Sequence, residues 1–273
     1  MTVMRARFFS LCAILALVLC VSTAWAQSNS TTATQSIATL KEQAASGDAV
    51  AQGHLGDLSY YGRGVPQNYT QAATWYRKAA DQGDATSQWS LGYAYDIGRG
   101  VPQDYAQAEI WYRKAADQGL VYAQWSLGSM YSDGHGIPQD YFQAAMWYRK
   151  AADQGLAEAQ SQLGWLYENG HGVPQDYAQA AMWYRKAADQ DDPLAQWSLG
   201  SLYELGHGVP QDYAEAYFWL DLAATGKIAA VKQEDIDKIR DETASHLTET
   251  ELNHVQERVR EWAEIHPSKA APQ

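Results

Sequence analysis

A segment of 36 residues occurs five times in succession in this chain, and no copy gains or loses a residue. The Leu-Gly pair at residues 55–56 returns at every 36-residue step as far as residues 199–200, and a tryptophan returns in the same way from Trp75 to Trp219. Repetition at a fixed period of about 20–50 residues is typical of proteins that stack one supersecondary unit upon the next. A single unit cannot bury its apolar face alone, so the period constrains the fold more than the overall composition does.

The first half of each copy predicts an amphipathic helix, which covers about residues 84–96 in the second copy. With roughly 100° of rotation per residue, Gln88, Leu91 and Tyr95 share one face, and this is the predicted core side. Gly92 lies inside the helix in every copy, where glycine costs about 1 kcal/mol relative to alanine. A cost that recurs five times indicates that another helix approaches closely at this position.

The second half of each copy predicts another helix after a turn. Two glycines and a proline within residues 98–102 end the first helix of the second copy. Asp104 and Gln107 then have the spacing of a capping box, and Trp111 lies on the apolar stripe that follows. Glycine follows this helix in three copies, whereas Asp191 takes its place in the fourth, so a slightly different junction is expected there.

The chain before the repeats has the composition of an export signal. Two arginines precede an apolar stretch at residues 8–21, and Ala-Trp-Ala at residues 24–26 predicts cleavage after Ala26. Both cysteines lie in the signal, so the mature chain would hold together by packing alone. The net charge of −12 becomes −14 after cleavage, which argues against nucleic acid and anionic membranes as partners. The expected location is the periplasm or the extracellular space.

The remaining segments follow from where the 36-residue pattern begins and decays. After the repeats, Thr248 and Glu251 have the spacing of a capping box and predict the start of a helix in this polar region. Helices with a polar outer face would cover the end of the stack there. The predicted order is a signal peptide (1–26), a flexible leader (27–36), a half-repeat helix (37–47), five repeats (48–226), capping helices (227–266) and a tail (267–273).

The repeated motifs identify the chain as similar to a known family. The LG-x2-Y core of the first helix, the GxGVPQDY turn and the A-x2-WY-x-KAA-x2-G second helix resemble the Sel-one-like repeat, a relative of the tetratricopeptide repeat. The resemblance covers about residues 40–224. It implies a right-handed α/α superhelical solenoid and a role as an adaptor in protein assembly, signalling or envelope processes. A cysteine-rich branch linked to β-lactam binding or cleavage has a disulfide in each repeat, which this chain lacks.

The face of the first helices that lies opposite the predicted core varies between copies, and it is the candidate binding surface. We call this surface, to which the candidate binding residues named below belong, the trough. Aromatic anchors ringed by polar groups are typical of peptide grooves, and tryptophans also stack on sugar rings. The alternative is that each tryptophan wedges against the first helix of the next repeat. The second-helix tryptophans are interpreted as core. The candidate binding residues are Trp89, Tyr93, Tyr122, Trp125, Trp165, Glu168, Trp197 and Glu204.

Other recurring polar residues are interpreted as exposed. His135, His171 and His207 recur at one turn position that holds arginine in the first two copies, and without cysteines or close acids they do not form a predicted metal site. The arginine-lysine pairs near the ends of the second helices are interpreted as a solvated outer face. The chain has no nucleophile elbow, zinc-protease motif or phosphate-binding loop. No cofactor is expected.

The sequence therefore favours a non-enzymatic, exported module that binds a protein or peptide in the concave face of the solenoid. A glycan-binding accessory of a cell-wall enzyme is the alternative, and a β-lactam-binding or β-lactam-hydrolysing protein is a more distant one. The identity of the partner does not follow from these residues.

Overall fold

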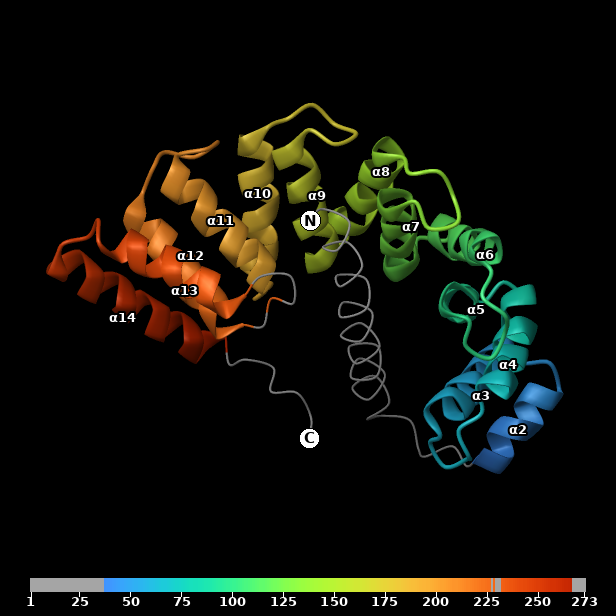
Figure 1. Cartoon of the computed structure of the whole chain (residues 1–273). Coiled ribbons are helices and arrows are strands. Elements are labelled where there is room, and N and C mark those ends of the chain that lie inside the picture. The colour runs from blue at the N-terminus through green and yellow to red at the C-terminus, as the bar shows by residue number, and fades with distance from the viewer. Residues whose placement is uncertain (1–36, 227, 229–231, 267–273) are drawn as a thin grey trace. The chain divides into compact units, whose positions relative to one another are not determined.

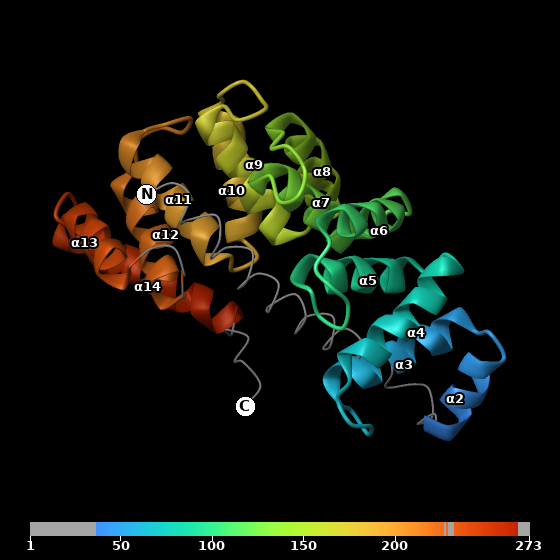
Figure 2. The same ribbon diagram turned by 45° about the vertical axis from the view of Figure 1, so that its right-hand side comes forward.

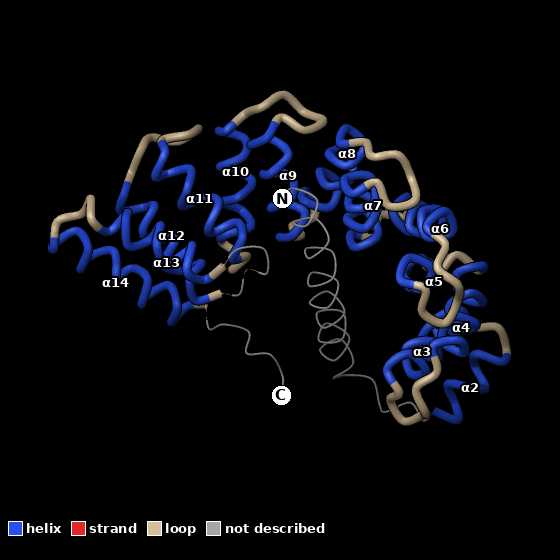
Figure 3. The backbone as a smooth tube through the Cα atoms, in the orientation of Figure 1, coloured by secondary structure: helices blue, strands red, loops and turns tan. Residues whose placement is uncertain are grey.

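The structure, a computed structural model, describes residues 37–226, residue 228 and residues 232–266. Over these residues every regular element is a helix, the helices are joined by loops and turns, and no strand occurs among them (Figure 1, Figure 3). The prediction of an all-α chain is confirmed, whereas the predicted signal peptide, leader and tail lie outside the described residues. The described helices are α2 (Ile37–Ala45), α3 (Ala49–Tyr61), α4 (Tyr69–Asp81), α5 (Ala85–Ile97), α6 (Tyr105–Asp117), α7 (Val121–Asp133), α8 (Tyr141–Asp153), α9 (Ala157–Asn169), α10 (Tyr177–Ala188), α11 (Pro193–Leu205), α12 (Tyr213–Thr225), α13 (Gln233–Ala244) and α14 (Glu249–Ile265).

The described helices form two compact units. We call residues 37–150 the N-terminal unit and residues 151–266 the C-terminal unit. The N-terminal unit contains α2 to α7 and most of α8, and the C-terminal unit contains the end of α8 and α9 to α14. Within a unit, a first helix packs on the second helix of its own repeat and on the second helix before it, as α5 packs on α6 and α4 (Figure 2).

The first helices begin in two different ways. The side chains of Asp48, Asp84 and Asp192 accept hydrogen bonds from the backbone N–H groups at the third helical residue, as N-caps do. Leu120 and Leu156 occupy the same position at α7 and α9 and make no such bond. All five first helices end at a glycine in the left-handed region, with φ between 66° and 71°.

The second helices do not begin with the complete capping box that the sequence predicts. Asp104 accepts from the N–H of Gln107 at 3.0 Å, which is one half of the box. The N–H of Asp104 donates to the carbonyl oxygen of Tyr95 at 3.0 Å instead of to the Gln107 side chain. The end of the first helix supplies this acceptor, so the return bond of the box is not needed. Both halves of the box are present at Thr248 and Glu251, at the start of α14.

The glycine inside each first helix lies against a side chain of the second helix, as predicted. A Cβ atom on Gly92 would lie 2.7 Å from the ring of Tyr112, closer than side chains pack. The same holds for Gly56 with Tyr76, Gly128 with Tyr148 and Gly164 with Tyr184. In the last repeat Leu220 replaces the tyrosine and lies 2.8 Å from a Cβ atom on Gly200.

The arginines of the second helices join neighbouring repeats, so the interpretation of a solvated outer face is wrong for them, whereas the lysines beside them are exposed as interpreted. Arg77 donates a hydrogen bond to the hydroxyl of Tyr95 in the next repeat, and its guanidinium lies 5.3 Å from the ring centre of Trp111. The ammonium group of Lys114 lies over the same ring, 3.8 Å from the centre of Trp111. A cation over an aromatic face is attracted by the ring's quadrupole. The arginine-tyrosine link recurs in Arg113–Tyr131 and Arg185–Tyr203.

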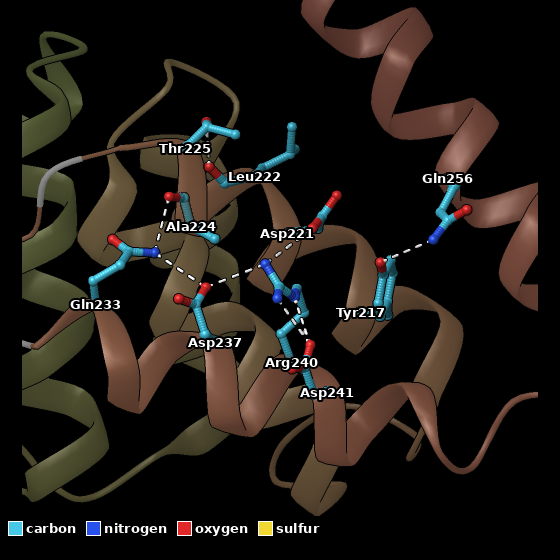
Figure 4. A network of polar contacts seen from close by, with 10 residues as sticks. All are labelled: Tyr217, Asp221, Leu222, Ala224, Thr225, Gln233, Asp237, Arg240, Asp241 and Gln256. Atoms are coloured by element: carbon cyan, nitrogen blue, oxygen red, sulfur yellow. Dashed lines mark hydrogen bonds and ion pairs between the residues drawn. The ribbon is translucent and has the colours of Figure 1, made fainter.

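Helix α13 covers the last repeat through a polar network (Figure 4). The guanidinium of Arg240 lies 3.7 Å from the carboxylate of Asp221 on α12 and 3.2 Å from that of Asp237. Gln256 of α14 donates to the hydroxyl of Tyr217 at 3.3 Å. Asp221 stands where the other repeats have the linking arginine, so an ion pair with Arg240 of α13 replaces the arginine-tyrosine link at this end.

Helix α14 supplies the apolar part of the same cover. Trp262 makes edge contacts with Phe218 and Trp219, with ring centres 5.8 Å and 5.5 Å apart. The guanidinium of Arg258 lies over Phe218 and forms an ion pair with Glu215 at 2.6 Å. Phe218 is buried as a result, whereas the residues at the same repeat position, Ile110, Met146 and Met182, are exposed.

Asp191 keeps the backbone conformation of the glycines it replaces. Its φ of 65° lies in the left-handed region, as do those of Gly83, Gly119 and Gly155. The predicted difference at this junction is in the side chain, because the Asp191 carboxylate accepts a hydrogen bond from the indole nitrogen of Trp262 at 3.2 Å. The residue therefore ties α14 to the preceding repeat.

Candidate interaction surface

Two of the trough tryptophans in the N-terminal unit pack between repeats. Trp89 is 7% exposed, and its indole N–H donates to the hydroxyl of Ser126 on α7 at 3.1 Å. Trp125 is 4% exposed, and its indole nitrogen has no hydrogen-bond partner among the described residues. This burial favours the packing alternative for both side chains, since little of either ring is left for a ligand.

The surroundings of Trp89 explain why a large side chain fits there. Leu120, in the N-cap position of α7, packs against the same core cluster as Trp89. At the preceding junction the equivalent residue is Gly53, where a Cβ atom would lie 2.7 Å from the hydroxyl of Ser87 and 3.7 Å from the carboxylate of Asp84. Space at this position is therefore set by the residue that begins the next first helix.

The trough tryptophans of the C-terminal unit retain more exposure. Trp197 packs against Ile228 and Ile236, so α13 covers it much as α7 covers Trp89, and its indole nitrogen is buried without a hydrogen bond among the described residues. Trp165 is half-buried and lies 5.0 Å from the ring of His171. Trp165 packs against the core cluster that includes Ala195 and Leu199 of the next first helix, α11.

The two candidate glutamates lie on half-buried positions of the C-terminal unit. Glu168 accepts a hydrogen bond of 2.6 Å from the hydroxyl of Tyr184, a buried residue of α10. Burial raises the pKa of Glu204, and the nearby carboxylate of Glu242 raises it further, whereas His246 lowers it. The Glu168 carboxylate is therefore held by the fold through Tyr184.

Tyr93 and Tyr122 present the outer aromatic surface of the N-terminal unit. Tyr93 is stacked on Trp89, with ring centres 6.0 Å apart and an interplanar angle of 14°. Tyr122 lies on Trp89 at the same distance with a tilt of 41°. Both tyrosines are half-buried, as Trp165 is, so part of each ring remains at the surface. The buried tryptophan thus supports two rings that a ligand can reach.

Three carboxylates lie along the ends of the first helices of this unit. We call Asp57, Asp96 and Asp133, together with the half-exposed rings of Tyr61 and Tyr93, the acidic strip. None of these three carboxylates is among the binding residues predicted from the sequence. Burial raises the pKa of Asp57 and of Asp96, and it raises the pKa of Asp133 to about 6, with the neighbouring Asp96 adding to the shift.

Buried tyrosines of the second helices hold two of these carboxylates from the core side. Tyr76 donates to Asp57 at 2.8 Å, and Tyr112 donates to Asp96 at 3.2 Å. The sequence analysis assigned no such role to the tyrosines. The available signal was that each stands directly after the core tryptophan in four copies and is absent from the fifth.

The recurring turn position that holds arginine or histidine contacts the preceding repeat. Arg99 lies 4.8 Å from the ring centre of Tyr69, and His135 is stacked on Tyr105 at 5.8 Å. His207 lies 4.8 Å from Tyr177 in the same way. In these three copies a flat cationic or aromatic group covers a tyrosine of the preceding repeat, whereas His171 lies against Trp165 of its own repeat. At the end of the repeats His246, after α13, stacks on Tyr213 at 4.2 Å.

Over the described ranges, no group of three histidine, cysteine or acidic side chains is arranged to hold a metal ion. Among the same residues, no helix has both the length and the apolar character of a membrane span.

Comparisons with known proteins agree on the family. The Sel1 repeat family matches residues 49–84, 85–120, 121–156, 157–192 and 193–227. A Sel1 repeat protein from Oxalobacter formigenes is 35% identical with a TM-score of 0.66, over 70% of this chain and 81% of that one. A protective antigen of uropathogenic Escherichia coli that displays the same fold is 30% identical with a TM-score of 0.56, over 87% of this chain and 59% of that one. No protein with a curated description matches. Five consecutive matches in register with five observed helix pairs place this chain in the Sel1 repeat family.

Proposed function

We propose that the chain is an exported, non-enzymatic binding protein that holds a segment of a partner protein on the first-helix face of its N-terminal unit. The observation that supports this most directly is the pair of half-exposed rings, Tyr93 and Tyr122, supported on buried Trp89. Rigid aromatic anchors with polar neighbours are the groups that dominate protein interfaces. These positions also differ between copies, so stacking of the repeats does not require them.

The test is crosslinking and capture from an envelope extract with the mature chain and a Tyr93→Ala/Tyr122→Ala variant. The variant should lose the captured partner by at least about tenfold, as expected for two anchor residues. A variant of Trp89 is unsuitable because its loss would disturb the core. The matched control is Ile110→Ala/Phe142→Ala, which removes two exposed apolar side chains from second helices of the same unit. Equal capture by the tyrosine variant and the wild type would contradict the proposal.

Glycan binding remains the alternative, and Trp165 is the residue on which it depends most. Half-exposed aromatic rings stack on sugar rings, and Trp165 is more accessible than Trp89 or Trp125. Co-sedimentation with insoluble peptidoglycan tests this idea. Binding that is lost in Trp165→Ala and retained in Tyr93→Ala/Tyr122→Ala would favour the glycan over the protein partner.

A further inference from the structure

Two second helices of the N-terminal unit present an exposed row of residues spaced one turn apart. We call these residues the outer ridge: Ala106, Ile110 and Lys114 of α6, and Phe142, Met146 and Lys150 of α8. The apolar side chains of Ile110, Phe142 and Met146 are between 42% and 59% exposed. Large apolar side chains gathered on one exposed face are typical of interaction sites, whereas single ones are ordinary.

The two helices of the outer ridge lie side by side. The guanidinium of Arg113 on α6 lies 5.8 Å from the ring centre of Trp147 on α8. Ile110 stands one turn before Arg113, and Met146 directly precedes Trp147. The apolar residues of the ridge therefore lie near the place where α6 and α8 meet.

Stacking of the repeats does not require apolar residues at these positions. The first repeat has Thr70 and Thr74 at the same positions of α4, and both are exposed. The core tryptophans behind the ridge are covered by its lysines, because the ammonium groups of Lys114 and Lys150 lie 3.8 Å and 3.9 Å from the ring centres of Trp111 and Trp147. The fold therefore leaves Ile110, Phe142 and Met146 without a packing role.

The fifth repeat shows which kind of element covers such a ridge. The same positions on α12 hold Ala214, Phe218 and Leu222, and α14 packs on this helix. Phe218 is 4% exposed, because Trp262 and Arg258 of α14 lie against its ring. Leu222 is buried as well. Within this fold, an amphipathic helix is thus the element that covers the outward side of a second helix.

The outer ridge differs from its counterpart on α12 in one respect, because it keeps a lysine where α12 has Leu222. Lys114 and Lys150 are exposed, and neither forms an ion pair within the described residues. Burial of an unpaired ammonium group is costly, so a helix that covers the ridge has to bring carboxylates beside its apolar stripe. A lysine also keeps the ridge hydrated when nothing covers it, which suits a contact that forms and separates.

We propose that the outer ridge binds an amphipathic helix of a partner protein. The apolar stripe of this helix covers Ile110, Phe142 and Met146, and its carboxylates meet Lys114 and Lys150. Recognition of a helix through anchors one turn apart is a common mode of binding. The inference goes beyond the proposed function, which places its partner segment on the first helices.

The probe is a fluorescent peptide of residues 247–266, because α14 covers the same ridge positions in the fifth repeat and contains five glutamates. A second peptide with Val259→Ser/Trp262→Ser lacks the apolar stripe. Fluorescence anisotropy measures the affinity of the mature chain for each peptide, and far-ultraviolet circular dichroism measures helix formation on binding.

The ridge variant is Ile110→Thr/Phe142→Thr/Met146→Thr. It introduces the residue that the first repeat has at each of these positions, so it should fold as the wild type does. The matched control is Val50→Thr/Leu205→Thr, which removes two similarly exposed apolar side chains from first helices.

The expected result is that only the first peptide binds, with a gain in helical signal. Its affinity should fall about tenfold in the ridge variant and less than about twofold in the control. Lys114→Gln/Lys150→Gln should weaken binding by about two- to threefold, and this loss should shrink at high ionic strength.

Unchanged affinity of the ridge variant would mean that the peptide displaces α14 from α12, and it would overturn the proposal. An equal loss in the control, or no binding of the first peptide, would overturn it too. Sedimentation velocity supplies a further check: a wild type that dimerises and a ridge variant that is monomeric would show that a second copy covers the ridge instead. Tyr93→Ala/Tyr122→Ala should bind the peptide as the wild type does, so this proposal and the proposed function fail separately.

Discussion

The junction between repeats 1 and 2 and the junction between repeats 2 and 3 have the same backbone and different chemistry. The residues that begin α5 and α7, Asp84 and Leu120, have φ of −64° and ψ of 110° and 114°. Asp84 caps its helix and faces Gly53, whereas Leu120 makes no cap and packs with Trp89. An N-cap bond contributes about 1 kcal/mol, and burial of a tryptophan contributes up to about 4–6 kcal/mol before entropy is counted. The comparison shows that the residue at the position of Gly53 and Trp89 changes together with the residue that begins the next first helix, Asp84 or Leu120.

The largest effect should follow from removing the tryptophan at the second of these junctions. Trp89→Ala leaves a cavity between α5 and α7, and the expected loss in the free energy of unfolding is about 3–5 kcal/mol. The control is Gly53→Ala at the same repeat position. Its Cβ atom would meet the hydroxyl oxygen of Ser87, and the substitution should change the free energy of unfolding by less than about 1 kcal/mol. Chemical denaturation measures both, and equal losses would refute the contrast.

The converse substitution tests whether the junction 1–2 rejects a large side chain. Gly53→Trp should destabilise the protein by about 1–3 kcal/mol or more, because the ring would meet Ser87 and Asp84. Adding Asp84→Leu should restore part of this loss, with a coupling of about 0.5–3 kcal/mol in a double-mutant cycle. Strictly additive effects of the two substitutions would show that the positions are independent.

A pH titration sharpens the comparison at a third junction, where Asp192 caps α11 beside Ser161. Burial raises the pKa of Asp192 from 3.8 to about 6, and Glu158 adds to the shift. Between these values the folded state binds the proton more tightly, so this group makes the protein less stable as pH rises from about 4 to 6. Asp192→Asn keeps a cap and should flatten this part of the profile of melting temperature against pH.

The control for that titration is Asp176→Asn, at the exposed N-cap of α10. If the two variants change the pH profile equally, loss of a capping charge rather than burial is the cause.

The smallest effect is expected one residue earlier, at Asp191. Asp191→Gly removes an unfavourable left-handed conformation and also removes the hydrogen bond from Trp262, so the net change should lie within about 0.5 kcal/mol. Asp191→Ala keeps the strain and loses the bond, so it should destabilise the protein by about 1 kcal/mol. Thermal unfolding separates the two, and an alanine variant as stable as the wild type would show that the hydrogen bond from Trp262 contributes nothing.

The helices, their turns and the close approach at Gly92 were predictable because each depends on residues that are near in sequence and repeat at 36 residues. The side-chain contacts between neighbouring repeats were not predictable from the sequence. Arg77 contacts Tyr95 and Trp111, which lie in the next repeat, and a basic pair near a helix end has the same sequence signature whether it is solvated or not. The burial of Trp89 was also undecided by sequence, because it depends on Leu120 and on the space that this residue leaves.

The pairing of Trp89 with Leu120, and of Gly53 with Asp84, has a consequence for the history of the gene. Near-identical repeats invite unequal recombination, which adds or deletes whole units in register. The common links, such as Arg77 with Tyr95 and Arg113 with Tyr131, would survive any such event. A duplication of residues 85–120 would carry Leu120 along with Trp89 and keep the pair, whereas a duplication of residues 84–119 would place Trp89 against an aspartate cap. The point at which the chain is cut therefore decides whether an added unit keeps its matched neighbour.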